Sequence, residues 1–360
     1  MKSYVEWYPI IIMLAIDFAL SICNILLKKI IMDGMNHFVF ITYRQSISAV
    51  FLAPIAFFLE RNKRPKLTPQ ILCYLFLSAI VGGSLTQYLF LLGIQYTSAT
   101  FACAFLNMVP VVTFLMALLF GLETTNIKDR SGRAKVIGTL ICLGGAFLLT
   151  FYKGKPLIHF SHFKDLSQTL EEPISSSKRN VQWIFGSMIL FAGTILWSSW
   201  FLIQAKIGKK YPCQYSSTVI MTFFSAIQSA ILTFSTDRTL SIWIPKEKII
   251  DMLSVVYTGL IGSGLCFVGM SWCVKKRGPV FTAAFSPLIQ VMAAMLDVPI
   301  LHEQLHLGSV IGSVIVIVGL YFLLWGKTKE MQKVSQETEE KKEKELNFQV
   351  HEANDEQEIH

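Results

Sequence analysis

The chain has 360 residues, of which 53% are hydrophobic and 16% are charged, a composition too apolar for a soluble protein with a wet surface. Its 32 lysines and arginines outnumber its 24 acidic residues, a surplus that sometimes indicates nucleic-acid binding. Here the basic residues lie in short clusters between apolar runs and form no recognition face. Juxtamembrane loops explain the surplus, and we expect no nucleic-acid partner.

Ten apolar stretches are long enough to cross a bilayer as helices. A hydrocarbon core of about 30 Å needs about 20 apolar helical residues, and the runs are continuous rather than alternating, which excludes barrel strands. The sequence therefore predicts an all-α membrane protein. The expected spans are 9–29, 38–59, 70–92, 99–121, 134–152, 182–204, 213–235, 249–272, 280–301 and 307–325.

Two segments are too polar for the membrane. Residues 153–181 form a linker with two prolines and a run of serines, and residues 326–360 form a Glu/Lys-rich tail that we expect to be disordered or a frayed helix. The linker divides the chain into a first five-helix repeat, 9–152, and a second, 182–325.

The basic residues indicate which side of the membrane each loop occupies. The loops after the third and ninth spans carry none, and those after the even-numbered spans carry Arg61, Lys63, Arg64 and Lys66; Lys128, Arg130 and Arg133; Lys206, Lys209 and Lys210; Lys275, Lys276 and Arg277; and Lys327, Lys329 and Lys333. By the positive-inside rule both termini are expected in the cytoplasm. The linker, with five basic residues, opposes this pattern, but it is longer and its charges are spread out.

An internal repeat appears when the sequence is shifted by 180 residues. The third and fourth spans then fall on the eighth and ninth, and the neutral loop 95–97 aligns with the basic loop 275–277. Because five spans is an odd number, the second copy must enter the membrane upside down, and the positive-inside rule then requires this exchange of charge. The sequence thus predicts two inverted repeats with a substrate site at their interface near the midplane.

Two charged residues inside predicted spans are candidates for function. An ionised Asp17 in the first span is costly unless it faces water or a partner, so we predict a place on the substrate path and a role in proton coupling. Arg44, beside Tyr43 in the second span, would attract a substrate carboxylate. Two alternatives stay open: Asp17 remains protonated, and Arg44, about 9 Å from its helix end, extends to the membrane surface.

Five amides and two tryptophans are further candidates for the lining of the path. Trp197 and Trp200 lie in mid-span, away from the interface where tryptophan is commonest, and indicate either a pocket wall or core packing. Polar side chains in a membrane face the bundle interior, where they bond a neighbouring helix or line a cavity. The amides are Asn24, Gln87, Asn107, Gln204 and Gln290.

Prolines, glutamates and glycines indicate how the helices bend and pack. Pro110 and Pro287 interrupt the fourth and ninth spans, where a kink would serve gating or be static. Glu123 and Glu303 end the corresponding helices, and we expect them to bond the N–H groups that begin the next helix. The glycines that allow close helix contact, with dimerisation as the alternative, include Gly138, Gly145, Gly312 and Gly319.

Enzymatic signals are poor. No phosphate loop, paired CxxC motif or catalytic constellation is present in the sequence. His302 and His306 have a helical metal-ligand spacing, but only Glu303 lies beside them. We therefore expect no metal, no cofactor and no enzymatic activity.

Several characteristic stretches are spread over nearly the full length. They are 58–65, 97–101 with Asn107 and Pro110, 152–154, Trp197-Ser198, Tyr211-Pro212, 278–281 with Pro287, and 319–321 with 324–327. In these stretches the chain resembles the plant WAT1-related, nodulin-21-like transporters, also called UMAMIT proteins, which carry paired EamA domains in the drug/metabolite transporter superfamily. It departs from their pattern at Asp17, where an uncharged polar residue is expected, and at His302, where glycine is usual.

The resemblance implies ten spans, cytoplasmic termini and residence in the plasma membrane or tonoplast. It also implies export or facilitated movement of amino acids, auxin or related metabolites. We therefore expect a secondary transporter of small organic metabolites, amino acids above all, with the lipid bilayer, the substrate and protons as partners. The alternatives are an auxin (indole-3-acetate) carrier and a non-transporting receptor or scaffold, and a homo-oligomer is compatible with either.

Overall fold

The computed structural model describes residues 2–32, 35–62, 64–97, 99–123, 129–152, 176–236, 243, 249–301 and 307–358. Within these ranges the regular elements are all helical, and ten helical stretches are long and apolar enough to cross a membrane. The predicted all-α class and the ten spans are confirmed. Most of the predicted linker, together with His302, Glu303 and His306, lies outside the described residues.

The first half supplies five of these stretches, and some of them are built from more than one element. Its elements are α1 (Lys2–Met32), α2 (His37–Glu60), α3 (Pro69–Ser78), η1 (Ala79–Ser84), α4 (Leu85–Tyr96), α5 (Ala99–Asn107), α6 (Val109–Leu119) and α7 (Arg130–Phe151). The second half contains α8 (Ser176–Lys210), α9 (Gln214–Thr236), α10 (Ile249–Tyr257), η4 (Thr258–Leu265), α11 (Cys266–Arg277), α12 (Pro279–Ala284), α13 (Ser286–Leu301) and α14 (Leu307–Glu358).

The elements η1 and η4 are π-helical segments in the middle of the third and eighth spans. Both are rich in glycine, which tolerates the wider turn of a π-helix and lets neighbouring helices approach. They correspond to each other under the 180-residue repeat. The two halves therefore share a local irregularity as well as a number of spans.

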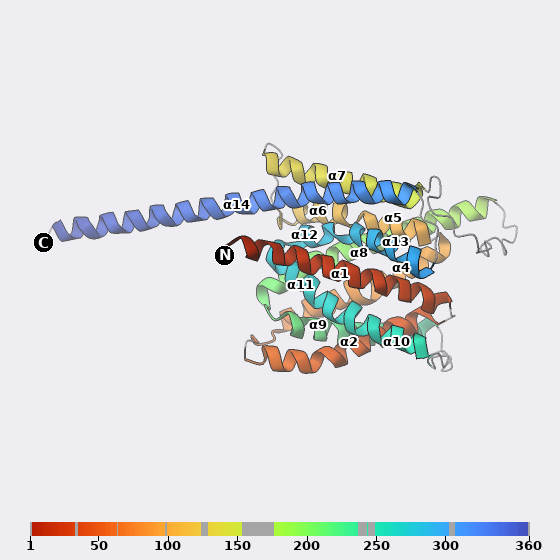
Figure 1. Ribbon diagram of the computed structural model, residues 1–360. Coiled ribbons are helices and arrows are strands. Elements are labelled where there is room, and N and C mark those ends of the chain that lie inside the picture. Colours follow the sequence, from red (N-terminus) through yellow and green to blue (C-terminus); the bar gives the residue numbers. More distant parts are fainter. Residues whose placement is uncertain are drawn as a thin grey trace.

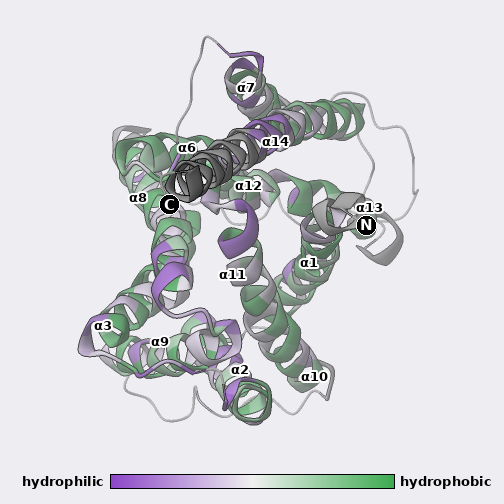
Figure 2. Cartoon of the chain, turned by 90° about the vertical axis from the view of Figure 1, so that its left-hand side faces the viewer, coloured by the Kyte–Doolittle hydropathy of each residue, from purple (hydrophilic) through white to green (hydrophobic). Residues whose placement is uncertain are grey.

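Two pairs of equivalent helices pack together at opposite edges of the bundle. Viewed along the bundle, α7 packs on α14 at one edge and α2 packs on α9 at the other, with α11 and α12 between them (Figure 2). Each pair joins two helices related by the 180-residue repeat, as expected for a pseudo-two-fold axis in the membrane plane. The chain begins, and α14 leaves the bundle, at the same end, here called the terminal end (Figure 1).

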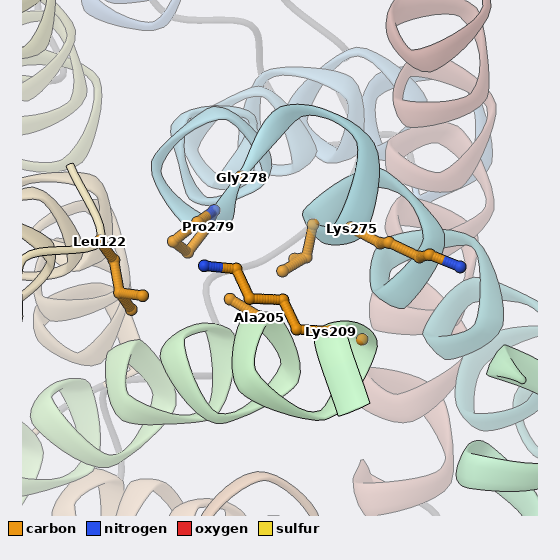
Figure 3. A pocket seen from close by; sticks show the side chains of 8 residues that line it. Leu122, Ala205, Lys209, Lys275, Gly278 and Pro279 are labelled. Atoms are coloured by element: carbon orange, nitrogen blue, oxygen red, sulfur yellow. The ribbon is translucent and has the colours of Figure 1, made fainter. Parts of the chain in front are cut away.

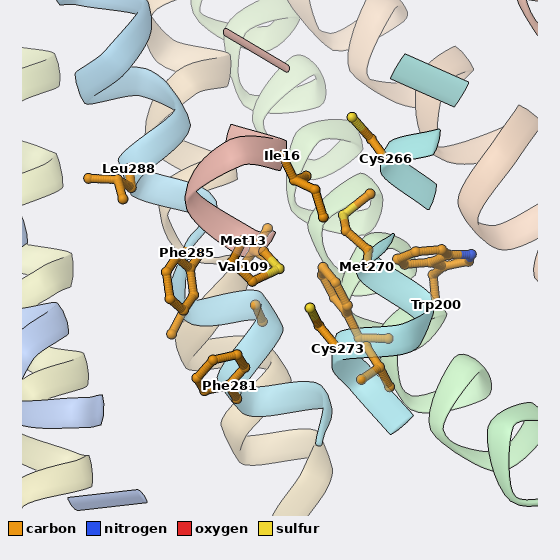
Figure 4. Packing of buried hydrophobic residues seen from close by; sticks show 14 of the residues in the cluster. Met13, Ile16, Val109, Trp200, Cys266, Met270, Cys273, Phe281, Phe285 and Leu288 are labelled. Carbon is orange, nitrogen blue, oxygen red and sulfur yellow. The ribbon is translucent and has the colours of Figure 1, made fainter. Parts of the chain in front are cut away.

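The largest apolar cluster fills the bundle centre from its middle toward the terminal end. It contains Trp200 and Phe201 of α8, Met270 of α11, and Phe281 and Phe285 at the break between α12 and α13 (Figure 4). All five side chains are at least nine-tenths buried. In the conformation described, apolar packing therefore closes the centre of the bundle on this side.

The charged tail is helical in the structure. Helix α14 continues beyond the bundle to Glu358 as one element of 52 residues. After Gly326 this segment has no glycine or proline and is rich in Glu, Lys and Gln, which have high helix propensity. High charge removes the reason to join a packed core, but it does not prevent a single helix from forming.

Candidate substrate path

The carboxyl group of Asp17 is enclosed by the bundle. The residue is 1% exposed, and its Oδ2 has no hydrogen-bond partner among the described residues. The thiols of Cys266 and Cys273 in α11 both lie within electrostatic range of it. A buried carboxyl group with an unused oxygen is available to bind a proton or a cationic group.

The side chain of Arg44 faces the same region from α2. Its guanidinium lies 5.9 Å from the centre of the Phe40 ring, and its Nε has no hydrogen-bond partner among the described residues. Cys266 is within electrostatic range of Arg44 as well as of Asp17. An acidic and a basic side chain from different helices therefore both lie within electrostatic range of Cys266.

Tyr43, the neighbour of Arg44, is engaged elsewhere. Its hydroxyl donates a hydrogen bond of 2.5 Å to the carbonyl of Trp243, and the two rings pack edge to face at 6.1 Å. In this conformation the side chain of Tyr43 is engaged by Trp243, the described residue between α9 and α10.

The two tryptophans of α8 form a stacked pair. Their ring centres are 5.1 Å apart and their planes differ by 9°. Trp200 is fully buried and donates its indole N–H to Met221 Sδ at 3.4 Å, whereas Trp197 is half-buried. Trp200 is thus a core residue, and Trp197 presents the more accessible edge of the pair.

Gln204 is a hydrogen-bonding node between the halves. Its Nε2 donates to Ser78 Oγ of α3 at 3.0 Å, and its Oε1 accepts from Ser271 Oγ of α11 at 3.4 Å. These bonds satisfy both ends of the amide, which fits the interhelical alternative of the sequence analysis.

Two other predicted amides meet across the repeat. Asn107 Nδ2 donates to Gln290 Oε1 at 2.9 Å, and Gln290 Nε2 donates to the carbonyl of Cys103 at 3.1 Å. This contact lies beside the helix breaks at Met108 and Phe285, which precede Pro110 and Pro287 in the chain. Of the remaining amides, Gln87 is half-buried and Asn24 is exposed.

The terminal end carries a buried ionic network. Glu123 pairs with Lys327 of α14 and, at 3.6 Å, with Lys135 of α7, whose Nζ also lies 2.8 Å from Glu330. Glu123 therefore joins α14 of the second half to the first half. We predicted that Glu123 bonds the N–H groups that begin the next helix. The five residues that separate it from Asp129 lie outside the described residues, so this stays a prediction.

The predicted packing glycines lie between α7 and α14. A Cβ at Gly138 would be 2.5 Å from the backbone nitrogen of Leu323, and one at Gly319 would be 2.4 Å from that of Cys142. A Cβ at Gly145 would be 2.7 Å from the nitrogen of Val316. These three glycines face the partner helix of the same chain, and Gly312 of α14 is buried.

A cavity of about 140 Å³ opens at the terminal end between α8 and α11. Figure 3 shows the amine of Lys209 directed into it, toward Gly278 and Pro279, whereas Lys275 extends away. Gly278 has a φ of 90°, which favours glycine, and gives α11 a sharp end. The remaining lining residues are Leu122, Ala205, Gly208 and Val274.

Sequence reasoning missed this cavity and one further residue. Lys209 was counted as a juxtamembrane charge, and nothing in the sequence separated it from its neighbours. Glu60 ends α2 and accepts hydrogen bonds from the backbone of Tyr215 at 3.0 Å and of Ser216 at 2.7 Å, at the start of α9. An acidic residue at the end of a helix could have been singled out from the sequence, but the sequence does not show that its partner is the start of α9.

Comparison with known proteins agrees with this architecture. The EamA-like transporter family model matches residues 7–151 and 184–325. A crystal structure that is 15% identical in sequence superposes with a TM-score of 0.63, covering 87% of this chain and 94% of the other, and supports the fold alone.

Similar chains are found in Arabidopsis thaliana. The WAT1-related protein At3g30340 is 51% identical over 326 residues, covering 90% of this chain and 88% of the relative. The WAT1-related protein At4g01440 is 50% identical over 327 residues, covering 91% and 88%. The match extends over both halves, so the chain is a WAT1-related member of the EamA-like transporter family, a membrane transporter of small molecules.

Proposed function

We propose that the chain is a secondary transporter that exports amino acids, or moves them in both directions, by alternating access between its inverted halves. The observation that carries this proposal is that an acidic and a basic side chain, Asp17 of α1 and Arg44 of α2, both lie within electrostatic range of Cys266. An amino acid carries an ammonium and a carboxylate on one carbon. The two side chains offer a partner to each.

The physical argument is the cost of charge in a membrane. Each charged group of a zwitterion loses hydration on entering the bundle, and a close partner of opposite sign restores part of that free energy. The guanidinium of Arg44 can form two parallel bonds to a carboxylate. The carboxylate of Asp17 would take the ammonium, or a proton when no substrate is bound.

The cavity at Lys209 would serve as the cytoplasmic mouth of the path. Basic loops at the terminal end support cytoplasmic termini, and the resemblance supports the plasma membrane or tonoplast. A positive side chain at this entrance would attract the substrate carboxylate before it passes the apolar cluster around Trp200. Pro110 and Pro287 would supply the bends at which the path opens.

The test is flux in proteoliposomes with a panel of labelled amino acids and indole-3-acetate, with and without a pH gradient. We expect amino-acid flux that falls at least tenfold in Arg44→Gln and is accelerated by the gradient in the original protein but not in Asp17→Asn. Ser187→Ala is the matched control, because Ser187 is a polar residue of α8 whose hydroxyl bonds only within its own helix, to Trp183, among the described residues. Unchanged pH dependence in Asp17→Asn would remove the coupling role.

The auxin alternative has its own supporting observation, the stacked tryptophans. The half-buried edge of Trp197 offers an aromatic surface for an indole ring. Indole-3-acetate has no ammonium, however, so it would leave Asp17 without a partner. Flux of indole-3-acetate without flux of any amino acid would replace the leading proposal, and absence of both from vesicles holding folded protein would favour a receptor or scaffold.

A further inference from the structure

The interface of α2 and α9 with the two π-helical segments holds a group of buried polar side chains without partners. Gln45 of α2 and Ser263 of η4 are each 0% exposed, and neither has a hydrogen-bond partner for its side chain among the described residues. The same is true of the hydroxyls of Ser48 and Ser225 and of Gln228 Nε2. An unpaired polar group is expensive inside a membrane, so these side chains need an arrangement in which they are paired.

These residues are equivalent positions of the two repeats. An offset of 180 residues relates Gln45 to Ser225, Ser48 to Gln228, Gly83 to Ser263 and Ser84 to Gly264. Every contact of α9 with η1 therefore has a counterpart between α2 and η4. Comparing the counterparts shows how the two halves differ in this conformation.

On the α9 side one polar contact is made. Ser84 Oγ of η1 donates to Gln228 Oε1 at 2.6 Å. Ser225 lies so close to Gly83 that a Cβ at position 83 would be 2.2 Å from its Oγ. On the α2 side the counterpart of the first contact has no donor, because Gly264 replaces Ser84. The counterpart of the second is Gln45 and Ser263, both unpaired.

A second pair of equivalent contacts shows that the two halves differ in how a neighbouring helix covers the π-helical segment. Gly82 of η1 is covered by Trp200 of α8, whereas its counterpart Gly262 of η4 is covered by Cys23 of α1. Symmetric halves would place residue 20, not residue 23, on Gly262. The covering residues thus differ by three positions, close to one helical turn.

We propose that Gln45 and Ser263 are positioning residues of the opposite-facing state, in which they hydrogen-bond to each other while the bond between Ser84 and Gln228 is broken. This pairing follows from the inverted repeats, because in the opposite-facing state each half takes the conformation that the other half has in the present structure. Gln45 then approaches Ser263 as Ser225 approaches Gly83 here. The inference rests on the alternating-access part of the proposed function.

Sterics limit how complete the exchange is. Ser225 Cβ lies 2.7 Å from the Cβ position of Gly83, a distance that two real Cβ atoms at 45 and 263 would not tolerate. The helices must therefore stand about 1 Å further apart in the other state to reach ordinary carbon contact. The longer side chain of Gln45 spans that gap. Each state then forms one polar pair and leaves the other unmade, which keeps the two states close in free energy.

The test is disulfide cross-linking of two double-cysteine variants in proteoliposomes, with linked peptides identified by mass spectrometry to separate them from native cysteines. Ser84→Cys/Gln228→Cys reports the present state, and Gln45→Cys/Ser263→Cys reports the opposite one. Val50→Cys/Ile231→Cys, on exposed positions of α2 and α9, is the matched control. We expect both reporter pairs to link and the control pair to remain unlinked.

The decisive step adds one alanine that removes the competing bond. Ser84→Ala should raise the initial cross-linking rate of the Gln45/Ser263 pair about fivefold, the shift in an equilibrium that one hydrogen bond of typical net strength produces. Gln45→Ala or Ser263→Ala should raise the rate of the Ser84/Gln228 pair similarly. Rates that do not change, or that change in the same direction for both pairs, overturn the proposal.

If the Gln45→Cys/Ser263→Cys variant does not elute as a folded species, the effect of Gln45→Ala or Ser263→Ala on cross-linking of the Ser84/Gln228 pair still decides the test. No transport substrate enters this assay. Its failure is therefore distinct from a failure to find amino-acid flux.

Discussion

The indole ring of Trp200 lies directly on the backbone of Gly82, where a Cβ would be 2.0 Å from ring atom Cδ1. Gly82 belongs to the π-helical segment of the first half and Trp200 to the first helix of the second. Because Trp200 also stacks on Trp197, this contact sets the distance between the halves at one wall of the proposed path.

Gly82→Ala is therefore expected to damage the protein. The added methyl group cannot be accommodated unless Trp200 moves, and overpacking of this kind costs about 1–3 kcal/mol. We expect a lower midpoint of thermal unfolding in detergent and reduced flux. Gly144→Ala is the control, because a Cβ at Gly144 meets nothing within 4 Å and alanine favours a helix by about 1 kcal/mol. Equal unfolding midpoints for the two variants would contradict this prediction.

The number and type of elements could be predicted from the sequence, but the partners of the polar residues could not. Each membrane span must be a long apolar helix to satisfy its own backbone, so hydropathy alone locates ten of them. Gln204 was recognised as a buried amide. Its partner Ser78, however, lies 126 positions away in the sequence, and nothing in the sequence around this small serine marks it as a hydrogen-bond partner. Which amide bonds a neighbour and which faces a cavity depends on packing.

The internal repeat predicted more of the structure than the positions of the spans did. The 180-residue offset that predicted inverted halves also relates η1 to η4 and Gln45 to Ser225. Gln45 was not among the predicted path residues, because a single glutamine in a span has no feature that marks it. Its importance follows only from the unmade contact with Ser263, which requires the structure.

Glu123→Gln is expected to loosen α14. The substitution removes the charge that pairs with Lys327 and Lys135, both of which are buried. Loss of one member of a buried ion pair costs about 3–5 kcal/mol, since the remaining charge stays desolvated. We expect a lower unfolding midpoint and earlier proteolytic cleavage after Gly326. Asp129→Asn should change little, because its pair with Lys333 is exposed; an equal effect would mean that burial does not decide the strength of this network.

Glu60→Ala is expected to fray the start of α9. The carboxylate accepts hydrogen bonds from two backbone N–H groups that have no partner within the helix, and capping interactions of this kind contribute about 0.5–2 kcal/mol. Hydrogen exchange should accelerate at Tyr215 and Ser216 and not in the middle of α9. Glu60→Gln retains an acceptor, so its exchange rates at Tyr215 and Ser216 should lie between those of the original protein and those of Glu60→Ala. Uniform acceleration throughout α9 would indicate global destabilisation instead of a lost cap.

Lys209→Ala tests the mouth of the proposed path. Its amine points into the cavity between α8 and α11, so its loss should weaken attraction of a carboxylate-bearing substrate entering from the terminal end. An exposed charge contributes modestly, and we expect KM to rise about two- to fivefold with kcat unchanged. Lys210→Ala is the control on the same helix, because Lys210 lies over the Tyr74 ring at 5.3 Å and does not line the cavity. The difference between the variants should shrink at high salt, and equal effects of both substitutions would reduce the role of Lys209 to general surface charge.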